Sequence, residues 1–234
     1  MKKVSIIIAI ICSSLLCAQV KVDQSTPRAA LESCIRAMER CNSSELTLLM
    51  PPEKRNKLRP CLQNTEIGQI ILVILTMSTD SPSFKWYFIP TDPAALEKYI
   101  RNCLQHKKYF AQVNGKWHVD LRVLFITRSP EDQHEVEQFF CRMVNYAANG
   151  NWDVFWQNVT PDTRSYLIRE CGSLKEVQKL LSSDKQAVQI INELNDPQIQ
   201  QQLLPFIIYF LNEGNCLKKI DGKYLLRHPD QQEF

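Results

Sequence analysis

The sequence predicts a helix-rich α+β protein built from two related repeats. Each repeat is expected to place N-terminal helices on a small antiparallel sheet that ends in a β-hairpin. Three observations predict this fold. The same short motifs recur in the same order, about 107 residues apart. Helix-start signals occur throughout both halves, and each half closes on a two-residue turn signal.

The internal repeat depends on four matched pairs of segments whose offsets differ by a few residues, as loop insertions would produce. In chain order they are Cys34 with Cys141, 51–53 with 160–162, Cys61 with Cys171, and 114–117 with 221–224. Four matches in one order are poorly explained by chance. We therefore assign residues 26–125 to repeat 1 and residues 126–234 to repeat 2.

The first 18 residues resemble a secretory signal peptide. Lys2 and Lys3 give a positive start, and residues 4–16 form an apolar run without charge that is too short to span a bilayer. Ala18 is a small residue suited to the cleavage site. The sequence thus predicts export to the periplasm or the medium, with cleavage after Ala18. A lipid anchor on Cys17 is disfavoured because the preceding Leu16 is large.

Removal of the first 18 of the 234 residues leaves 216, enough to bury one large core or two small ones, with residues 19–25 as a linker. The net charge of +3 falls to about +1 when Lys2 and Lys3 are lost. A charge so near neutral argues against a nucleic-acid partner. The apolar run 203–211 is too short for a transmembrane segment, so we expect a soluble mature protein.

Helix starts are signalled where proline follows a residue that can cap a helix with its side chain. This pattern occurs at 26–27, 92–93, 129–130, 160–161 and 196–197. Residues 67–77 and 203–211 are apolar nearly all round, which predicts helices buried on most sides. Further short helices are expected at 174–181 and 187–194, and a strand at 84–89.

Each repeat should end in a tight hairpin, because Asn114-Gly115 and Asp221-Gly222 supply the positive φ angles of a two-residue turn. In the first hairpin the alternation predicts an inward face of Phe110, Trp117, Val119 and Leu121. The opposite, solvent-facing side would carry Tyr109, Ala111, Lys116, His118 and Asp120. The second hairpin places Leu217, Tyr224 and Leu226 at the equivalent inward positions.

Seven of the nine cysteines remain after signal removal, and in an exported chain this favours disulfides over metal or redox use. The preferred pairing is one bridge per repeat, Cys61–Cys103 and Cys171–Cys216. Cys34 and Cys141 fall on apolar helix faces and are interpreted as buried thiols. Cys34 cannot pair with Cys41, seven residues on along the same helix, because the two are about 10 Å apart.

The sequence predicts no catalytic, cofactor-binding or metal-binding residue. No glycine belongs to a phosphate-binding loop or a nucleophile elbow. The four histidines lack a second ligand at the spacing of a metal motif and are interpreted as surface residues. Trp152 and Trp156 stand one helical turn apart. Core packing is the preferred reading, with a ligand pocket as the alternative.

One family resemblance spans most of both halves. The elements Thr26-Pro27, Pro52-Glu53 and Asn114-Gly115-Lys116-Trp117 resemble the pattern of exported nuclear-transport-factor-2-like (cystatin-like) domains, and 129–130, 150–153, 160–161 and 221–224 repeat it. The resemblance implies N-terminal helices against a curved antiparallel sheet of four or more strands. It transfers no catalytic residue to this chain.

The leading hypothesis is therefore an exported, non-enzymatic protein that binds an unknown protein or small ligand, with the cleft between repeats as the expected place. A pocket-based enzyme of the isomerase or hydrolase type is one alternative. A structural component of a cell-surface assembly is the other.

Overall fold

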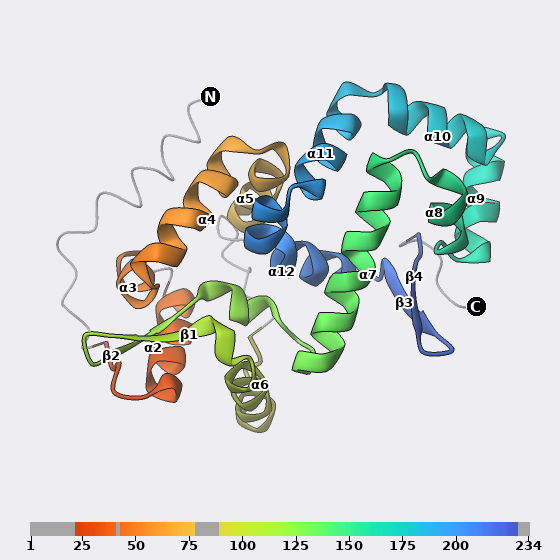
Figure 1. Cartoon of the computed structure of the whole chain (residues 1–234). Coiled ribbons are helices and arrows are strands. Elements are labelled where there is room, and N and C mark those ends of the chain that lie inside the picture. Colours follow the sequence, from red (N-terminus) through yellow and green to blue (C-terminus); the bar gives the residue numbers. More distant parts are fainter. Residues whose placement is uncertain (1–21, 41–42, 78–88, 229–234) are drawn as a thin grey trace. The chain divides into compact units, whose positions relative to one another are not determined.

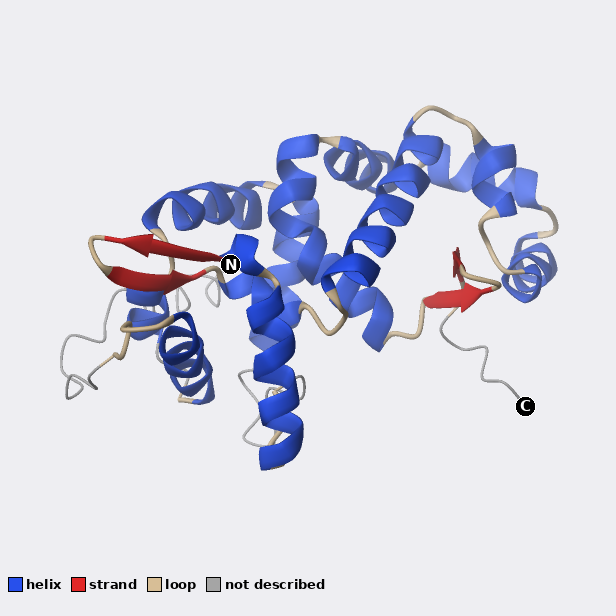
Figure 2. Cartoon of the chain, turned by 60° about the horizontal axis from the view of Figure 1, so that its bottom comes forward, coloured by secondary structure: helices blue, strands red, loops and turns tan. Residues whose placement is uncertain are grey.

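The computed structural model describes residues 22–40, 43–77 and 89–228. These residues form eleven α-helices and two antiparallel sheets of two strands each, which confirms the helix-rich α+β class (Figures 1 and 2). Within the described part of the chain, neither sheet reaches the four strands that the family resemblance implies. The strand expected at 84–89 lies outside the described residues, except for Ile89.

The chain divides into two compact units. The first comprises residues 1–57 and 74–129, and the second comprises residues 58–73 and 130–234. The second unit thus includes a segment that the repeat assigns to the first half. Each unit is considered by itself below.

In the described residues of the first half, five helices precede a hairpin that is flanked by two short 3₁₀ turns. Its elements are α2 (Pro27–Glu39), α3 (Ser43–Leu49), α4 (Pro52–Asn64), α5 (Glu66–Met77), α6 (Pro93–Gln105), η1 (Lys107–Tyr109), β1 (Phe110–Val113), β2 (Lys116–Val119) and η2 (Leu121–Phe125).

The second half contains six helices followed by a hairpin (Figure 1). Its elements are α7 (Pro130–Ala148), α8 (Trp152–Gln157), α9 (Pro161–Cys171), α10 (Leu174–Ser183), α11 (Lys185–Asn195), α12 (Pro197–Glu213), β3 (Leu217–Ile220) and β4 (Lys223–Leu226).

The predicted helix starts are confirmed, because all five prolines stand first in a helix. The side chain of Thr26 accepts a hydrogen bond from Ala29 N at 3.0 Å, and Asp92 accepts one from Ala95 N at 2.8 Å. Thr160 and Asp196 cap α9 and α12 in the same way. Each cap satisfies a backbone donor that has no partner within its own helix.

Both hairpins form in the expected register. Val113 pairs with Lys116 in the first and Ile220 with Lys223 in the second. Asn114 and Asp221 adopt positive φ angles of 52° and 49°, as their turns require.

Gln24, which lies in the linker expected at 19–25, forms hydrogen bonds with the backbone of β2. Gln24 O accepts a hydrogen bond from Trp117 N at 2.9 Å, and Gln24 Nε2 donates to Trp117 O at 2.8 Å. These two bonds occupy backbone groups along β2 that its partner strand leaves open.

One prediction for the first hairpin is wrong, because Asp120 and Tyr109 are buried rather than solvent-facing. Strand alternation stops at Val119, and the Asp120 side chain caps η2 by accepting a bond from Arg122 N at 3.2 Å. Asp120 also receives the Arg122 guanidinium, with Nε 2.9 Å from Oδ1 and a second bond from Nη2 to Oδ2. Both side chains are almost fully buried, and the guanidinium lies over the Tyr109 ring, 5.8 Å from its centroid.

One face of helix α6 forms hydrogen bonds with the backbone of residues 123–128, the segment that follows the hairpin. Tyr99 Oη donates to Leu124 O at 2.5 Å, Asn102 Nδ2 to Ile126 O at 3.1 Å, and Cys103 Sγ to Val123 O at 3.6 Å. One turn further on, the His106 ring lies 2.9 Å from Arg128 O. The spacing of these four residues places them on one side of the helix. That side therefore supplies donors to the carbonyls of the segment after the hairpin, of which Val123 O also accepts a bond from Ile126 N at 3.1 Å.

The corner between α4 and α5 lies within the second unit and depends on close backbone approach. A Cβ on Gly68 would lie 2.1 Å from Cys61 O, so only glycine fits there. Thr65 Oγ1 accepts from Gly68 N at 2.9 Å. The Glu193 carboxylate, 127 residues away in sequence, accepts from Glu66 N at 3.0 Å and from Ile67 N at 3.1 Å. The N-terminus of α5 is thus capped by Thr65, the residue before the helix, and by Glu193 of α11.

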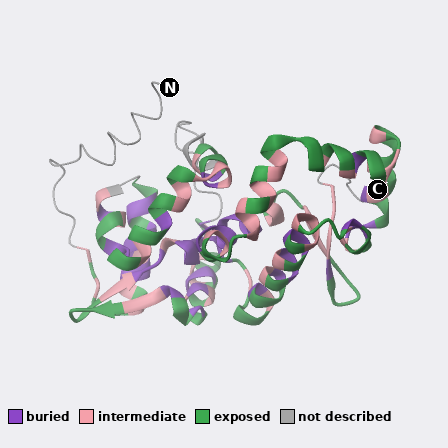
Figure 3. Cartoon of the chain, turned by 45° about the horizontal axis from the view of Figure 1, so that its top comes forward, coloured by how far each residue is buried: buried purple, intermediate pink, exposed green. Residues whose placement is uncertain are grey.

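Buried, intermediate and exposed residues are mixed along most of the helices (Figure 3). The two helices that are apolar all round differ in burial. Residues 203–209 of α12 are all buried, which confirms the prediction for that helix. In the part of α5 whose burial is described, residues 67–73, Ile71 is buried but Ile70 and Val73 are 37% and 54% exposed, so the expectation of burial on most sides is wrong for this part of the helix. Composition alone does not show how many neighbours surround a helix.

Trp152 and Trp156 both lie in the core of the second unit, as the preferred reading expected. Their rings stack with centroids 6.0 Å apart, and Phe155 packs edge-on against each of them. These side chains fill space beside α7 and do not line either groove described below.

Candidate functional site

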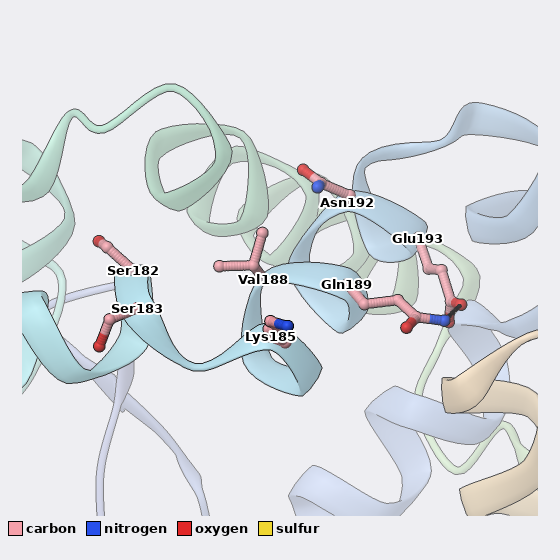
Figure 4. Close-up of a pocket in the computed structure, with 7 residues that line it drawn as sticks. All are labelled: Ser182, Ser183, Lys185, Val188, Gln189, Asn192 and Glu193. Carbon is pink, nitrogen blue, oxygen red and sulfur yellow. Dashed lines mark hydrogen bonds between the residues drawn. The ribbon is translucent and has the colours of Figure 1, made fainter.

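Two adjoining grooves lie at the turn between α10 and α11 in the second unit. The larger has a volume of about 510 Å³ and is lined by Ser182, Ser183, Lys185, Val188, Gln189, Asn192 and Glu193 (Figure 4). The second, of about 450 Å³, is lined by Leu180, Leu181, Ser183, Asp184 and Ala187. The sequence predicts the two helices but marks none of these residues as a site.

Asp184 builds the turn that shapes both grooves. It ends α10, where its N–H donates to Leu180 O at 3.0 Å, and it begins α11, where its side chain accepts from Ala187 N at 2.7 Å. One residue therefore serves as C-cap and N-cap, and the two helices follow each other without a loop. This fixes Ser183 at the boundary of the two grooves.

The larger groove offers hydrogen-bonding groups but no arrangement suited to catalysis. Its carboxylate, that of Glu193, is occupied by the two backbone donors of α5 and by Gln189 Nε2 at 3.0 Å, as Figure 4 shows for the latter pair. No histidine or cysteine lines it, so its serine hydroxyls have no adjacent base there.

Apolar side chains accompany these polar groups. Helix α11 contributes Ala187, Val188, Ile190, Ile191 and Leu194, and none of its residues is fully buried, although it packs against α7, α10 and α12. On α10, Val177 is buried but Leu180 is 58% exposed. Both helices are amphipathic, yet their apolar faces are covered only in part.

The histidines occupy four different environments. His134 is exposed, as expected. His106 is buried and held by the Arg128 carbonyl, so its interpretation as a surface residue is wrong. His118 is half-buried, with Nδ1 enclosed, although the hairpin alternation placed it toward solvent. The ring of His228 packs on Tyr166 with centroids 4.3 Å apart.

The six described cysteines are present as thiols, so the structure contains neither expected bridge. Cys171 and Cys216 fall in one unit, and their pairing stays a prediction. Cys61 and Cys103 are assigned to different compact units, whereas the sequence analysis expected them to tie one repeat together. Sequence spacing could not reveal that residues 58–73 are grouped with the second half.

The first unit instead brings together Cys34, Cys103 and Asp120. Burial raises the pKa of the Cys103 thiol to about 12, and burial together with Cys103 and Asp120 raises that of Cys34 further. Cys34 was expected on a core face, and the structure confirms it as fully buried. The two thiols are close enough for a charge on one to oppose a charge on the other.

The raised thiol pKa values predict a loss of stability at alkaline pH in the reduced protein. An unfolded thiol ionises near pH 9, whereas the folded thiols hold their protons, so stability present below pH 9 declines as pH rises toward about 12. We expect the free energy of unfolding to fall by roughly 1–3 kcal/mol between pH 9 and 11. Urea denaturation after refolding in a phosphine reductant measures this.

The control for this experiment is the double variant Cys34→Ala/Cys103→Ala, which should lose the alkaline component. An equal pH dependence in both proteins would assign the effect to other groups.

Among the described residues, no group of three or more histidine, cysteine, aspartate or glutamate side chains could hold a metal ion. No helix in the described ranges is long and apolar enough to cross a membrane. No protein-family model, curated protein or solved structure matches the chain.

Proposed function

We propose that the protein is an exported, non-enzymatic binding protein that receives a segment of a partner protein along α10 and α11. The observation that carries this proposal is the incomplete cover of the apolar faces of these two helices. Five apolar side chains of α11 remain only partly buried, and Leu180 extends the same kind of surface beyond the turn.

The chemistry of the grooves favours a peptide segment as the ligand. The exposed Leu180 and the partly buried aliphatic side chains of α11 provide the apolar contact that dominates binding energy at protein interfaces. The hydroxyl and amide groups of Ser182, Gln189 and Asn192 border that contact and can hydrogen-bond to a peptide backbone. The signal-like N-terminus supports the assignment to an exported protein.

The proposal predicts that the chain without its first 18 residues selects peptides with apolar side chains from a displayed library of random peptides. Leu180→Glu should weaken the binding of a selected peptide about tenfold or more, because a buried charge replaces an apolar contact. Fluorescence anisotropy with a labelled peptide measures the affinity.

The matched control is Leu48→Glu, since Leu48 is a similarly exposed helix leucine in the first unit, 64% accessible to solvent. It should leave the affinity unchanged. Failure to select any peptide, or equal affinities for wild type and Leu180→Glu, would refute the proposal.

A further inference from the structure

Two Asn-Gly pairs stand at exposed turns of the chain, and the structure holds them differently. Asn114-Gly115 forms the tip of the first hairpin, and Asn149-Gly150 follows the last residue of α7. All four residues are exposed. In such a pair the glycine nitrogen can attack the asparagine side-chain amide, because glycine has no Cβ to hinder the approach of its backbone. Each pair is therefore a candidate for spontaneous loss of the amide.

Hydrogen bonds hold both reacting groups of the second pair. Gly150 N donates to Ala147 O at 3.2 Å, and Asn149 Nδ2 donates to Asn145 O at 2.8 Å. Attack needs Gly150 N to lose its proton and Asn149 Nδ2 to leave, so both bonds have to break before the reaction. That requirement slows the conversion of Asn149 by about tenfold or more relative to an unrestrained pair.

The first pair carries no such restraint. Among the described residues, neither the Asn114 side chain nor Gly115 N has a hydrogen-bond partner. The strand pairing ends at Val113 and Lys116, which lie opposite each other on either side of the turn. A Cβ on Gly115 would meet no heavy atom within 4 Å, so open space surrounds this residue. The turn can therefore rotate to bring Gly115 N to Asn114 Cγ without displacing a packed side chain.

We propose that Asn114 is a site of spontaneous deamidation in this protein. Gly115 N loses its proton and bonds to Asn114 Cγ, the Cγ–Nδ2 bond breaks, and the amide nitrogen leaves as ammonia with that proton. The product is a cyclic succinimide, which water opens. Cleavage between the ring nitrogen and Cγ gives aspartate, and cleavage between the ring nitrogen and the backbone carbonyl carbon gives isoaspartate. Water is the only co-reactant, and no electrons are transferred.

Isoaspartate changes the first hairpin because it lengthens the main chain of the turn, which then runs through the Cβ and Cγ atoms of residue 114. A two-residue turn fixes the pairing of the strands on either side of it. The lengthened turn no longer matches the register that places Gln112 opposite Trp117. Trp117 also forms two hydrogen bonds with Gln24, and β2 packs against α2 and α3. The modification therefore weakens the packing of the first unit.

The test compares folded and urea-unfolded samples of the chain without its first 18 residues during incubation at mildly alkaline pH. Peptide mapping by mass spectrometry follows the exchange of amide for acid at each Asn-Gly pair, and an isoaspartyl methyltransferase with a labelled methyl donor detects isoaspartate. In urea the two pairs should convert at similar rates, because no fold restrains either of them. In the folded protein Asn114 should convert about tenfold or more faster than Asn149.

Two matched variants connect the reaction to the hairpin. Asn114→Asp has no amide to lose but suits the turn, since Asp221 occupies the same position of the second hairpin with a φ of 49°. It should abolish ammonia release at the first hairpin, whereas Asn149→Asp should leave the conversion rate of Asn114 unchanged. After incubation, wild type should melt a few degrees lower than Asn114→Asp treated in the same way.

Three results for the folded protein would overturn the proposal. They are similar conversion rates at the two pairs, faster conversion of Asn149, and an Asn114 that stays intact while the unfolded chain converts. An unchanged melting temperature in a fully converted sample would refute the effect on the first hairpin.

Discussion

Replacing Asp120 with alanine is expected to lower the free energy of unfolding by about 3–5 kcal/mol. The substitution leaves the Arg122 guanidinium buried without its carboxylate, and both side chains are at most 4% exposed in the folded protein. It also removes the cap that Asp120 provides to η2. Urea denaturation followed by circular dichroism measures the change.

One further variant separates charge from shape at this pair, and a second variant at the surface serves as the control. Asp120→Asn retains the shape and a hydrogen-bond acceptor but removes the charge. Its free energy of unfolding should therefore lie between those of wild type and Asp120→Ala. Glu53→Ala removes a carboxylate that pairs with Lys57 at the surface, where the Glu53 side chain is 74% exposed. This variant should hardly change the midpoint of urea denaturation. A small effect of Asp120→Ala would mean that Arg122 reaches solvent when its partner is removed.

Gly68→Ala is expected to destabilise the protein by about 3 kcal/mol. In an open helix this change would stabilise by about 1 kcal/mol, because alanine is the better helix former. The corner between α4 and α5 reverses that sign. The added methyl would lie 2.1 Å from Cys61 O and 2.8 Å from Leu62 Cα, which are backbone atoms and cannot rotate away.

The midpoint of chemical denaturation measures this effect, and near-ultraviolet circular dichroism reports whether the second unit remains well packed. Gln69→Ala is the matched control, because Gln69 is the next residue of α5 and is exposed. It should behave like wild type. If Gly68→Ala is as stable as Gln69→Ala, the corner can widen without loss of its contacts.

Local signals in the sequence predicted the elements that depend on neighbouring residues. A capping side chain before proline placed helix starts, and Asn-Gly and Asp-Gly placed both hairpins in the correct register. These features are set within a few residues by φ preference and by backbone donors that need an acceptor. They are therefore visible without knowledge of the rest of the fold.

Contacts between distant segments were not predictable in this way. Nothing near Glu193 shows that its carboxylate caps a helix that begins at Glu66. Alternation placed Asp120 toward solvent, since it takes no account of a buried arginine two residues later. Spacing in the sequence also could not show that Cys61 and Cys103 belong to different compact units.

The candidate site was missed for a related reason. Apolar periodicity identifies α10 and α11 as amphipathic helices, and such helices normally turn their apolar face to a core. Whether that face is covered depends on the amount of surrounding structure. The exposure of Leu180 became evident only once the neighbouring helices were placed.

The grouping of residues 58–73 with the second half has a consequence for any attempt to cut the protein in two. Expression of residues 130–234 alone would delete the helical corner whose backbone donors occupy Glu193, and would leave that carboxylate facing solvent at the edge of the groove. The complementary fragment, which ends at residue 129, would contain the corner but not Glu193, the acceptor of its backbone N–H groups. We therefore expect each half to lose helical content when it is expressed alone, and mixing both fragments should restore more helical content than the sum of the separate parts.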